Sequence, residues 1–343
     1  MRTSDPDQQL VGATSRVPRA GREPLAAARR HLEDGPDIGW EAPSRYGRGA
    51  ARVRRALRRM LQPYTMRQAP FERSIVDSVA SLSRTTAIVG QAALAVRLSG
   101  ADVVDVKTTV GPLWLHRNDQ LVTPHLKAGH AWEPELAAFL RRSLEPGMTF
   151  VDVGAHVGYF SVLAHQAMGA AGEIIAVEPQ PETLDILRAN LWRNGCLDAL
   201  VIPVAAYSHF GHLELVVNEE NRAGGGVGRE NAGGTLIPCA PLDELLGSGK
   251  FDIVKIDAEG CDHLIVAGAS RIIADNPELR IVVEFWPRAE KIRDHSPAEI
   301  LDLYANAGLA LHRIGSDGSL LPLDKGAVLS QSDEFFELVL ARG

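Results

Sequence analysis

The second half of the chain alternates between short apolar runs and longer stretches in which apolar residues recur every three or four positions. Runs that are apolar almost throughout are typical of parallel strands covered by helices on both faces. They lie near residues 149–153, 173–177, 200–204, 251–256 and 279–284. The periodic stretches predict helices near 158–168, 181–193, 262–273 and 296–307. This alternation predicts a doubly wound α/β domain with a mostly parallel sheet over about residues 130–343.

Three further segments complete this domain. The segment WEPELAAFLRRSL, residues 132–144, predicts an amphipathic helix. Apolar runs at 309–314 and 335–341 are separated by a predicted loop alone, so they predict an antiparallel hairpin at the C-terminal end. The glycine-rich stretch 218–235 predicts a mobile loop beside the pocket.

The first 129 residues divide into three parts. Residues 1–48 are rich in Gly, Pro, Ser and Arg without periodicity, which predicts a flexible leader. Residues 49–100 predict a helical extension, with helices near 49–61 and 69–82. Residues 101–129 predict a small β-element. Its alternating runs are Val103–Thr109, Leu113–His116 and Gln120–Thr123.

The composition is that of a globular protein, with 45% hydrophobic and 23% charged residues. It excludes a disordered, collagen-like or coiled-coil chain. No apolar run approaches the roughly 20 residues that cross a bilayer, and the start MRTSDPDQQL has no signal-peptide core, so a cytoplasmic protein is predicted. Cys196, Cys239 and Cys261 are too scattered for a disulfide framework or a tetrahedral zinc site.

The charge is unevenly distributed. The first 60 residues carry 13 arginines against 7 acidic residues, whereas the whole chain has a net charge of −7. Such a head can contact nucleic acid, anionic lipid or the acidic body, and a solvated extension is the simpler interpretation. No aromatic residue lies among the arginines from 52 to 59 to stack on bases, so nucleic-acid binding is not predicted.

The segment TFVDVGAHVGYFSVLA, residues 149–164, predicts a ligand site. A strand ends near Asp152, a tight turn contains Gly154 and Gly158, and a helix follows. Open α/β sheets bind ligands at the carboxyl ends of their strands, where glycines let the backbone approach the ligand. Twenty residues after Gly158 the next strand ends in Glu178, where a carboxylate accepts hydrogen bonds from ribose hydroxyls.

The acid at position 152 distinguishes between nucleotide cofactors. A dinucleotide fingerprint GxGxxG is missing, because residues 155 and 156 are Ala and His. Asp152 would repel a pyrophosphate but would attract S-adenosylmethionine, whose ammonium and sulfonium groups are cationic. A packing turn without a ligand is the alternative. His156 tolerates positive φ, so it serves either the turn geometry or a contact with the cofactor or substrate.

Three motifs resemble those of the FkbM-type methyltransferases, which use S-adenosylmethionine. They are VDVGAHVGYFS, VEPQPETLDILRANLWRNG and VKIDAEGCDHLIVAGA. The last departs from the usual KIDVEG-x-E pattern at Ala258 and Asp262. The resemblance covers about residues 130–343. It implies a class I, Rossmann-like methyltransferase fold and, most often, methylation of a hydroxyl on a sugar or secondary metabolite.

The KIDAEG segment supplies the candidate catalytic residues. Lys255 and Asp257 share one face of the predicted strand, and a buried lysine needs an anionic partner such as Asp257. We predict that Asp257 acts in methyl transfer. Glu259 is a second candidate base or an N-cap of the next helix. His263, in the first turn of that helix, is either a base or a packing residue.

Glu284 ends the neighbouring strand, so it forms an acidic trio with Asp257 and Glu259. Such a trio suits Mg²⁺ or a polyhydroxylated acceptor. No dedicated metal motif is present, and no metal ligand is assigned. Upstream, Trp132 and Glu133 are predicted pocket residues that contact the cofactor. For Glu133 the alternative is an acid favoured by the helix dipole.

Together these features predict an S-adenosylmethionine-dependent O-methyltransferase that acts on a small-molecule or glycan acceptor. Two alternatives remain open. One is N-methyl transfer, which needs less help from a base, and the other is a binding module that has kept the fold but lost catalysis. The acceptor and the oligomeric state are not determined by the sequence.

Overall fold

The computed structural model describes residues 102–216, 226–227, 234–258, 260–292, 295–331 and 333–342. The predicted leader and helical extension lie outside this part of the chain, as does most of the glycine-rich stretch 218–235. Within the described part, no helix is long and apolar enough to cross a membrane.

Eight strands form the central sheet, in the order β13-β12-β14-β11-β10-β3-β4-β5. Five of them are parallel to one another and match the predicted apolar runs. They are β3 (Thr149–Val153), β4 (Glu173–Val177), β5 (Leu200–Ile202), β10 (Ile253–Ile256) and β11 (Arg280–Phe285). The predicted doubly wound parallel core is therefore confirmed.

The C-terminal strand enters the sheet instead of ending at its edge. β14 (Phe336–Arg342) lies between β11 and β12 (Leu309–Ile314) and is antiparallel to both. The predicted antiparallel pairing is confirmed, but the connection contains β13 (Leu320–Pro322) and α14 (Lys325–Ser330) as well as loops. This insertion places Glu337 opposite Glu284 of β11.

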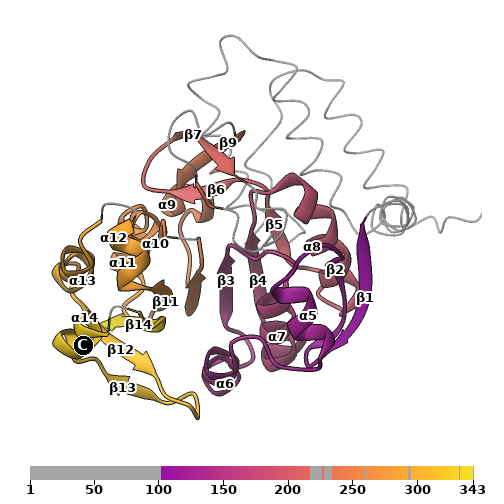
Figure 1. The fold of residues 1–343 in the computed structure, drawn as a ribbon, viewed down its shortest axis with the longest axis horizontal. Helices are drawn as coiled ribbons and strands as arrows, with labels where there is room; N and C mark the ends of the chain where they lie inside the picture. The colour runs from indigo at the N-terminus through magenta and orange to yellow at the C-terminus, as the bar shows by residue number, and fades with distance from the viewer. Residues whose placement is uncertain are drawn as a thin grey trace, which may run out of the picture.

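Helices cover both faces of the sheet (Figure 1). Consecutive strand residues contribute to opposite layers, since Phe150 packs into one core cluster and Val151 into the other. The first layer contains α6 (Pro134–Ser143), α7 (Tyr159–Met168) and α8 (Pro181–Arg193). The second contains α9 (Leu242–Leu246), α10 (Asp262–Ala267), α11 (Ser270–Asp275) and α13 (Pro297–Asn306).

The small β-element is partly as predicted. β1 (Val103–Thr108) and β2 (Gly111–His116) form an antiparallel hairpin, and α8 contacts β2. The third predicted run, Gln120–Thr123, is wrong as a strand, because its end belongs to α5 (Val122–Lys127). Asp119 explains the difference, since its Oδ1 accepts hydrogen bonds from two backbone N–H groups at the start of this helix.

Two features were not predicted. A second sheet follows β5 and lies near α9 in Figure 1, with the strand order β6-β9-β7-β8. Its strands are β6 (Ala205–Tyr207), β7 (Gly211–Val216), β8 (Gly226–Val227) and β9 (Thr235–Pro241). The predicted helix 262–273 is divided into α10 and α11, because the chain turns at Gly268 and Ala269.

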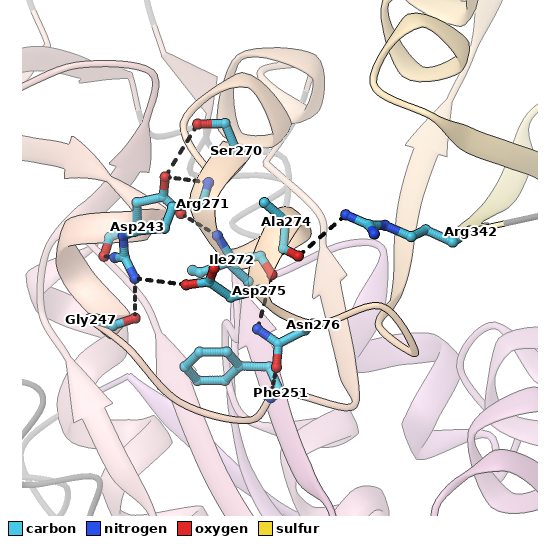
Figure 2. A network of polar contacts seen from close by, with 10 residues as sticks. All are labelled: Asp243, Gly247, Phe251, Ser270, Arg271, Ile272, Ala274, Asp275, Asn276 and Arg342. Atoms are coloured by element: carbon cyan, nitrogen blue, oxygen red, sulfur yellow. Dashed lines mark hydrogen bonds and ion pairs between the residues drawn. The ribbon is translucent and has the colours of Figure 1, made fainter.

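A polar network links α11 to α9 (Figure 2). Both helices belong to the second layer, on the face of the sheet opposite α7. The Asp243 carboxylate accepts hydrogen bonds from the backbone N–H groups of Arg271 and Ile272, each at 2.8 Å. The Arg271 guanidinium donates to the backbone oxygens of Asp243 and Gly247. Since helix-terminal N–H groups have no partner within the helix, Asp243 satisfies groups that would otherwise be unpaired.

We expect Asp243→Ala to lower the free energy of unfolding by about 1–3 kcal/mol, because it leaves partly buried N–H groups unpaired. Thermal unfolding should show a melting temperature lower by about 2–10 °C. Asp302→Asn is the control, since it breaks only an exposed 3.1 Å pair with Lys325 and should change stability by less than about 0.5 kcal/mol. Equal effects of the two variants would contradict this role of Asp243.

Candidate active site

The turn after β3 is packed tightly against two neighbouring elements. Gly154 and Gly158 have φ of 76° and 87°, which favours glycine. A Cβ on Gly154 would overlap the Asp257 carbonyl oxygen, and one on Gly158 would lie 2.8 Å from Leu187 Cδ1. Protein packing therefore requires both glycines, and their contact with a cofactor stays a prediction.

His156 sits inside this turn with φ of 47°, as its predicted tolerance of positive φ allows. Its ring stacks on that of His116, with the centroids 5.9 Å apart. Burial lowers the pKa of His156 to about 4, so the imidazole is neutral at physiological pH. Its buried Nε2 has no hydrogen-bond partner within the described part of the chain, which leaves one ring nitrogen for a ligand.

Glu178 holds the turn from the end of β4. Its Oε2 accepts from the backbone N–H of His156 and its Oε1 from that of Gln180, both at 2.8 Å. Burial raises the pKa of Glu178 to about 7 even though these two hydrogen bonds lower it. Each carboxylate oxygen keeps a second lone pair for a ribose hydroxyl.

Gln180 is a candidate that the sequence analysis missed. The residue is buried, and its Nε2 has no partner among the described residues. A polar residue two positions after Glu178, at the end of the predicted strand, was the available signal. Its amide nitrogen is a hydrogen-bond donor that a ligand could satisfy.

Asp152 points toward the α7 layer from β3 and is 1% exposed. Its Oδ2 accepts a 2.6 Å hydrogen bond from the Ser161 hydroxyl, whereas no described residue bonds its Oδ1. Burial raises the pKa of Asp152. The register of β3 and β10 sets this carboxylate beside Lys255.

Lys255 is the one basic residue placed among these acids in the described part of the chain. It is 3% exposed, and its Nζ donates a 2.8 Å hydrogen bond to Asp257 Oδ2. Nζ also lies 5.0 Å from the centre of the Phe160 ring. Burial lowers the pKa of Lys255, but Asp257, Asp152 and Glu133 outweigh it and raise the pKa above its ordinary value. The predicted pairing of Lys255 with Asp257 is confirmed.

Three carboxylates gather on the same side of the sheet. Glu133, Asp257 and Glu284 each place an oxygen within 4.8 Å of the others. Asp257 and Glu284 are thus together as predicted and Glu133 joins them, while Glu259, the third acid of the predicted trio, lies outside the described residues. Asp257 and Glu284 come together because their strands, β10 and β11, are parallel neighbours.

Glu337 adds a fourth acid that the sequence analysis missed. It comes from β14, and its side chain is hydrogen-bonded to Glu133. Burial raises the pKa of Glu337 to about 10 and that of Glu133 to about 7. At neutral pH Glu337 therefore keeps the proton of this pair and donates a hydrogen bond to Glu133.

Glu133 and Trp132 enter the site from the segment before α6. Glu133 has φ of 41° and makes no side-chain cap on α6. The Trp132 backbone N–H donates to the Tyr159 hydroxyl at 3.2 Å, and this hydroxyl also bonds Thr109 Oγ1 at 2.7 Å. The Tyr159 link between this segment and the β1–β2 turn was not predicted.

Asp262 and His263 begin α10 and have different surroundings. Asp262 is buried, and its Oδ1 accepts a hydrogen bond from the Glu284 backbone N–H at 3.3 Å. Its Oδ2 has no partner among the described residues. Burial raises the pKa of Asp262 to about 8. The structure places His263 in another cluster, with Glu290 and His295. Its role as a base stays a prediction.

The residues around the turn fit S-adenosylmethionine. Asp152 Oδ1, His156 Nε2 and Gln180 Nε2 are buried polar atoms that have no partner among the described residues, and a ligand with an ammonium, a carboxylate and a base would satisfy them. Mg²⁺ fits less well. Of the three clustered carboxylates, Asp257 already bonds Lys255 and Glu133 bonds Glu337.

Comparison with known proteins gives a family match over part of the chain. Residues 152–309 match the profile of the Methyltransferase FkbM domain. No curated protein matches the sequence. The methyltransferase FkbM from Methylobacillus flagellatus KT superposes with a TM-score of 0.40 at 17% identity, over 64% of this chain and 52% of that chain. This chain thus spans about half of that protein. An O-methyltransferase from Bacillus cereus in complex with SAH gives 0.38 at 15% identity, over 62% and 83%.

The raised pKa values predict that the stability of the cofactor-free protein falls as pH rises. Glu133 and Glu178 titrate near 7 and Asp262 near 8, whereas unfolded carboxyls titrate near about 4. The folded state therefore binds more protons than the unfolded state between about pH 5 and pH 8, and the free energy of unfolding decreases across this window. We expect scanning fluorimetry to show a falling melting temperature from pH 6 to pH 9.

The asparagine in Asp262→Asn cannot ionise, so this variant loses one proton fewer across the window. We therefore expect its melting temperature to fall less steeply with pH than that of the parent. Glu182→Gln, at an exposed position in the first turn of α8, is the matched control and should leave the slope unchanged. A melting temperature that rises with pH in this window would refute the proton count.

Proposed function

Because residues 152–309 belong to the methyltransferase FkbM domain family, we propose that this protein methylates a hydroxyl oxygen of a small-molecule or glycan acceptor with S-adenosylmethionine. The observation that carries the proposal is the position of one buried lysine among carboxylates, next to the glycine turn. The turn offers unsatisfied polar atoms to a cofactor, and the carboxylates offer oxygens to hydroxyl groups.

We assign cofactor binding to the residues around the turn. Asp152 attracts the cationic end of the cofactor, Glu178 accepts from the ribose hydroxyls, and Gln180 donates to the base. The neutral His156 presents Nε2 to the same ligand. When bound, S-adenosylmethionine supplies an electrophilic methyl group.

The acceptor hydroxyl is assigned to the carboxylate cluster. Asp257 Oδ2 is engaged by Lys255 at 2.8 Å, so Oδ1 is the oxygen that we assign to the hydroxyl proton. Glu133 and Glu284 accept hydrogen bonds from further hydroxyls, which suits a polyhydroxylated acceptor. Orientation and a general base then act together, and a base contributes about 10²–10⁴-fold in rate. Glu259 stays a second candidate base.

N-methyl transfer is the alternative within the same fold. A neutral amine needs less help in losing its proton, so it would use the carboxylates for orientation only. An inactive binding module is the other alternative. The Lys255–Asp257 pair disfavours an inactive binding module, because burying a charged pair is costly and the fold alone does not require such a pair.

Isothermal titration calorimetry tests the cofactor. We expect S-adenosylhomocysteine to bind, and Asp152→Asn and Glu178→Gln each to weaken binding by about tenfold or more, because each removes a charged hydrogen-bond acceptor. Glu182→Gln is again the control and should bind normally. Binding of NAD without any response to S-adenosylhomocysteine would refute the assignment.

Steady-state kinetics with a hydroxylated acceptor test the base. Asp257→Asn keeps the shape of the side chain and removes its charge, so kcat and kcat/KM should fall together by about 10²-fold or more. S-adenosylhomocysteine affinity should stay within about threefold. Activity of the parent enzyme should survive chelators. Full kcat in Asp257→Asn would show that the proton leaves by another route, as N-methylation allows.

A further inference from the structure

A second cluster of ionisable residues lies beside α10, apart from the carboxylates around Lys255. It consists of His263 from α10, Glu290 from α12 (Pro287–Ile292) and His295, which precedes α13. Each residue offers one ligand atom, and the three atoms lie within 4.8 Å of one another. Residues from three separate segments thus meet at one point.

The geometry within the cluster is close. His295 Nδ1 lies 3.0 Å from Glu290 Oε2, and the rings of His263 and His295 are 4.5 Å apart and nearly perpendicular. His263 and Glu290 are buried, whereas the His295 side chain is 34% exposed. Two ligands are therefore fixed by the core, and the third lies at the surface, where it can adjust.

The donor set differs from that of the first cluster. Two imidazoles and one carboxylate are ligands for Zn²⁺, while Mg²⁺ prefers oxygen alone. Among the described residues no lysine or arginine is paired with Glu290, whereas Lys255 is paired with Asp257 in the first cluster. Ligands at the usual distance of about 2.0–2.1 Å in a tetrahedron lie roughly 3.3 Å apart. The three ligand atoms, which lie within 4.8 Å of one another, would have to move closer together to bind the ion.

We propose that His263, Glu290 and His295 bind one Zn²⁺ ion, with water as the fourth ligand. The ion joins α12 to α10. Because α12 starts two residues after the end of β11, the bound ion would also fix the segment that follows Glu284. Tyr304, which is 1% exposed, is close enough to both Asp262 and Glu290 for their charges to raise its pKa. The site is independent of which acceptor is methylated.

The simplest competing explanation is a hydrogen-bonded His295–Glu290 pair with His263 packed against it. That arrangement holds the segment without a metal. It predicts no zinc retention, and it predicts that substitution of His263 affects packing alone.

Metal binding by full-length, tag-free protein separates the two explanations. After dialysis against chelator, the protein is equilibrated with limiting Zn²⁺ and a competing chromophoric chelator. We expect one equivalent of Zn²⁺ to bind. His295→Asn and His263→Asn should each weaken binding by about 100-fold or more, since even supporting residues of metal sites contribute 10–100-fold. His165→Asn, from α7 in the other layer, is the matched control and should bind as the parent does.

Two further readouts test the ligand set directly. Co²⁺ in the parent should show the intense visible absorption of a tetrahedral ion, and His295→Asn should lose it. Zn²⁺ at about a hundredfold excess over its Kd should raise the melting temperature of the parent but not of the histidine variants. His295 is partly exposed, so folding is not at risk, and S-adenosylhomocysteine binding reports on the fold.

Absence of zinc under competition overturns the proposal. Retention that neither histidine variant changes also overturns it, because the ion would then bind elsewhere. Either result leaves the methyltransferase assignment intact, since that assignment is tested by cofactor binding and kinetics.

Discussion

The ammonium group of Lys255, buried in the middle strand of the sheet, is the constraint on which the active site depends. A buried cation is costly unless carboxylates surround it. The fold meets this requirement with residues from four segments: Asp152 in β3, Asp257 after β10, Glu133 before α6 and Glu337 in β14. Alternation places Lys255 and Asp257 on the same face of the sheet, and the register of β3 and β10 sets Asp152 beside Lys255.

The site contains more acids than one lysine can neutralise. Bound protons reduce the excess negative charge. Burial raises the pKa of Glu337 to about 10, and Glu133 accepts a hydrogen bond from the protonated Glu337. Such a site holds excess negative charge only at higher pH. A cationic ligand replaces those protons electrostatically, so the same burial that costs stability in the free protein favours binding of a sulfonium cofactor.

Local pattern determined much of the fold but not the complete site. Apolar runs located the five parallel strands, and the Lys255–Asp257 pair followed from alternation and the cost of a buried charge. Glu337 could not be found this way, because it is distant in sequence and enters only through the insertion of β14 between β11 and β12. The helix α5 was missed because one side chain, Asp119, overrides a strand-like pattern. Gly154 was assigned to ligand approach, yet its close neighbour is the Asp257 carbonyl, a contact between distant segments.

The start of α10 shows how adjacent residues can serve different chemistry. Asp262 accepts a hydrogen bond from the Glu284 backbone and so supports the acidic site. His263, the next residue, joins Glu290 and His295 in a separate group. In the first group a lysine already neutralises the carboxylates, which disfavours a metal. In the second, no lysine or arginine among the described residues pairs with Glu290, the single carboxylate, which favours a metal. The two clusters therefore differ in the ligands that their charges favour. The acidic cluster suits a cationic cofactor and a hydroxylated acceptor. The imidazole cluster suits a divalent ion that fixes the segment after β11.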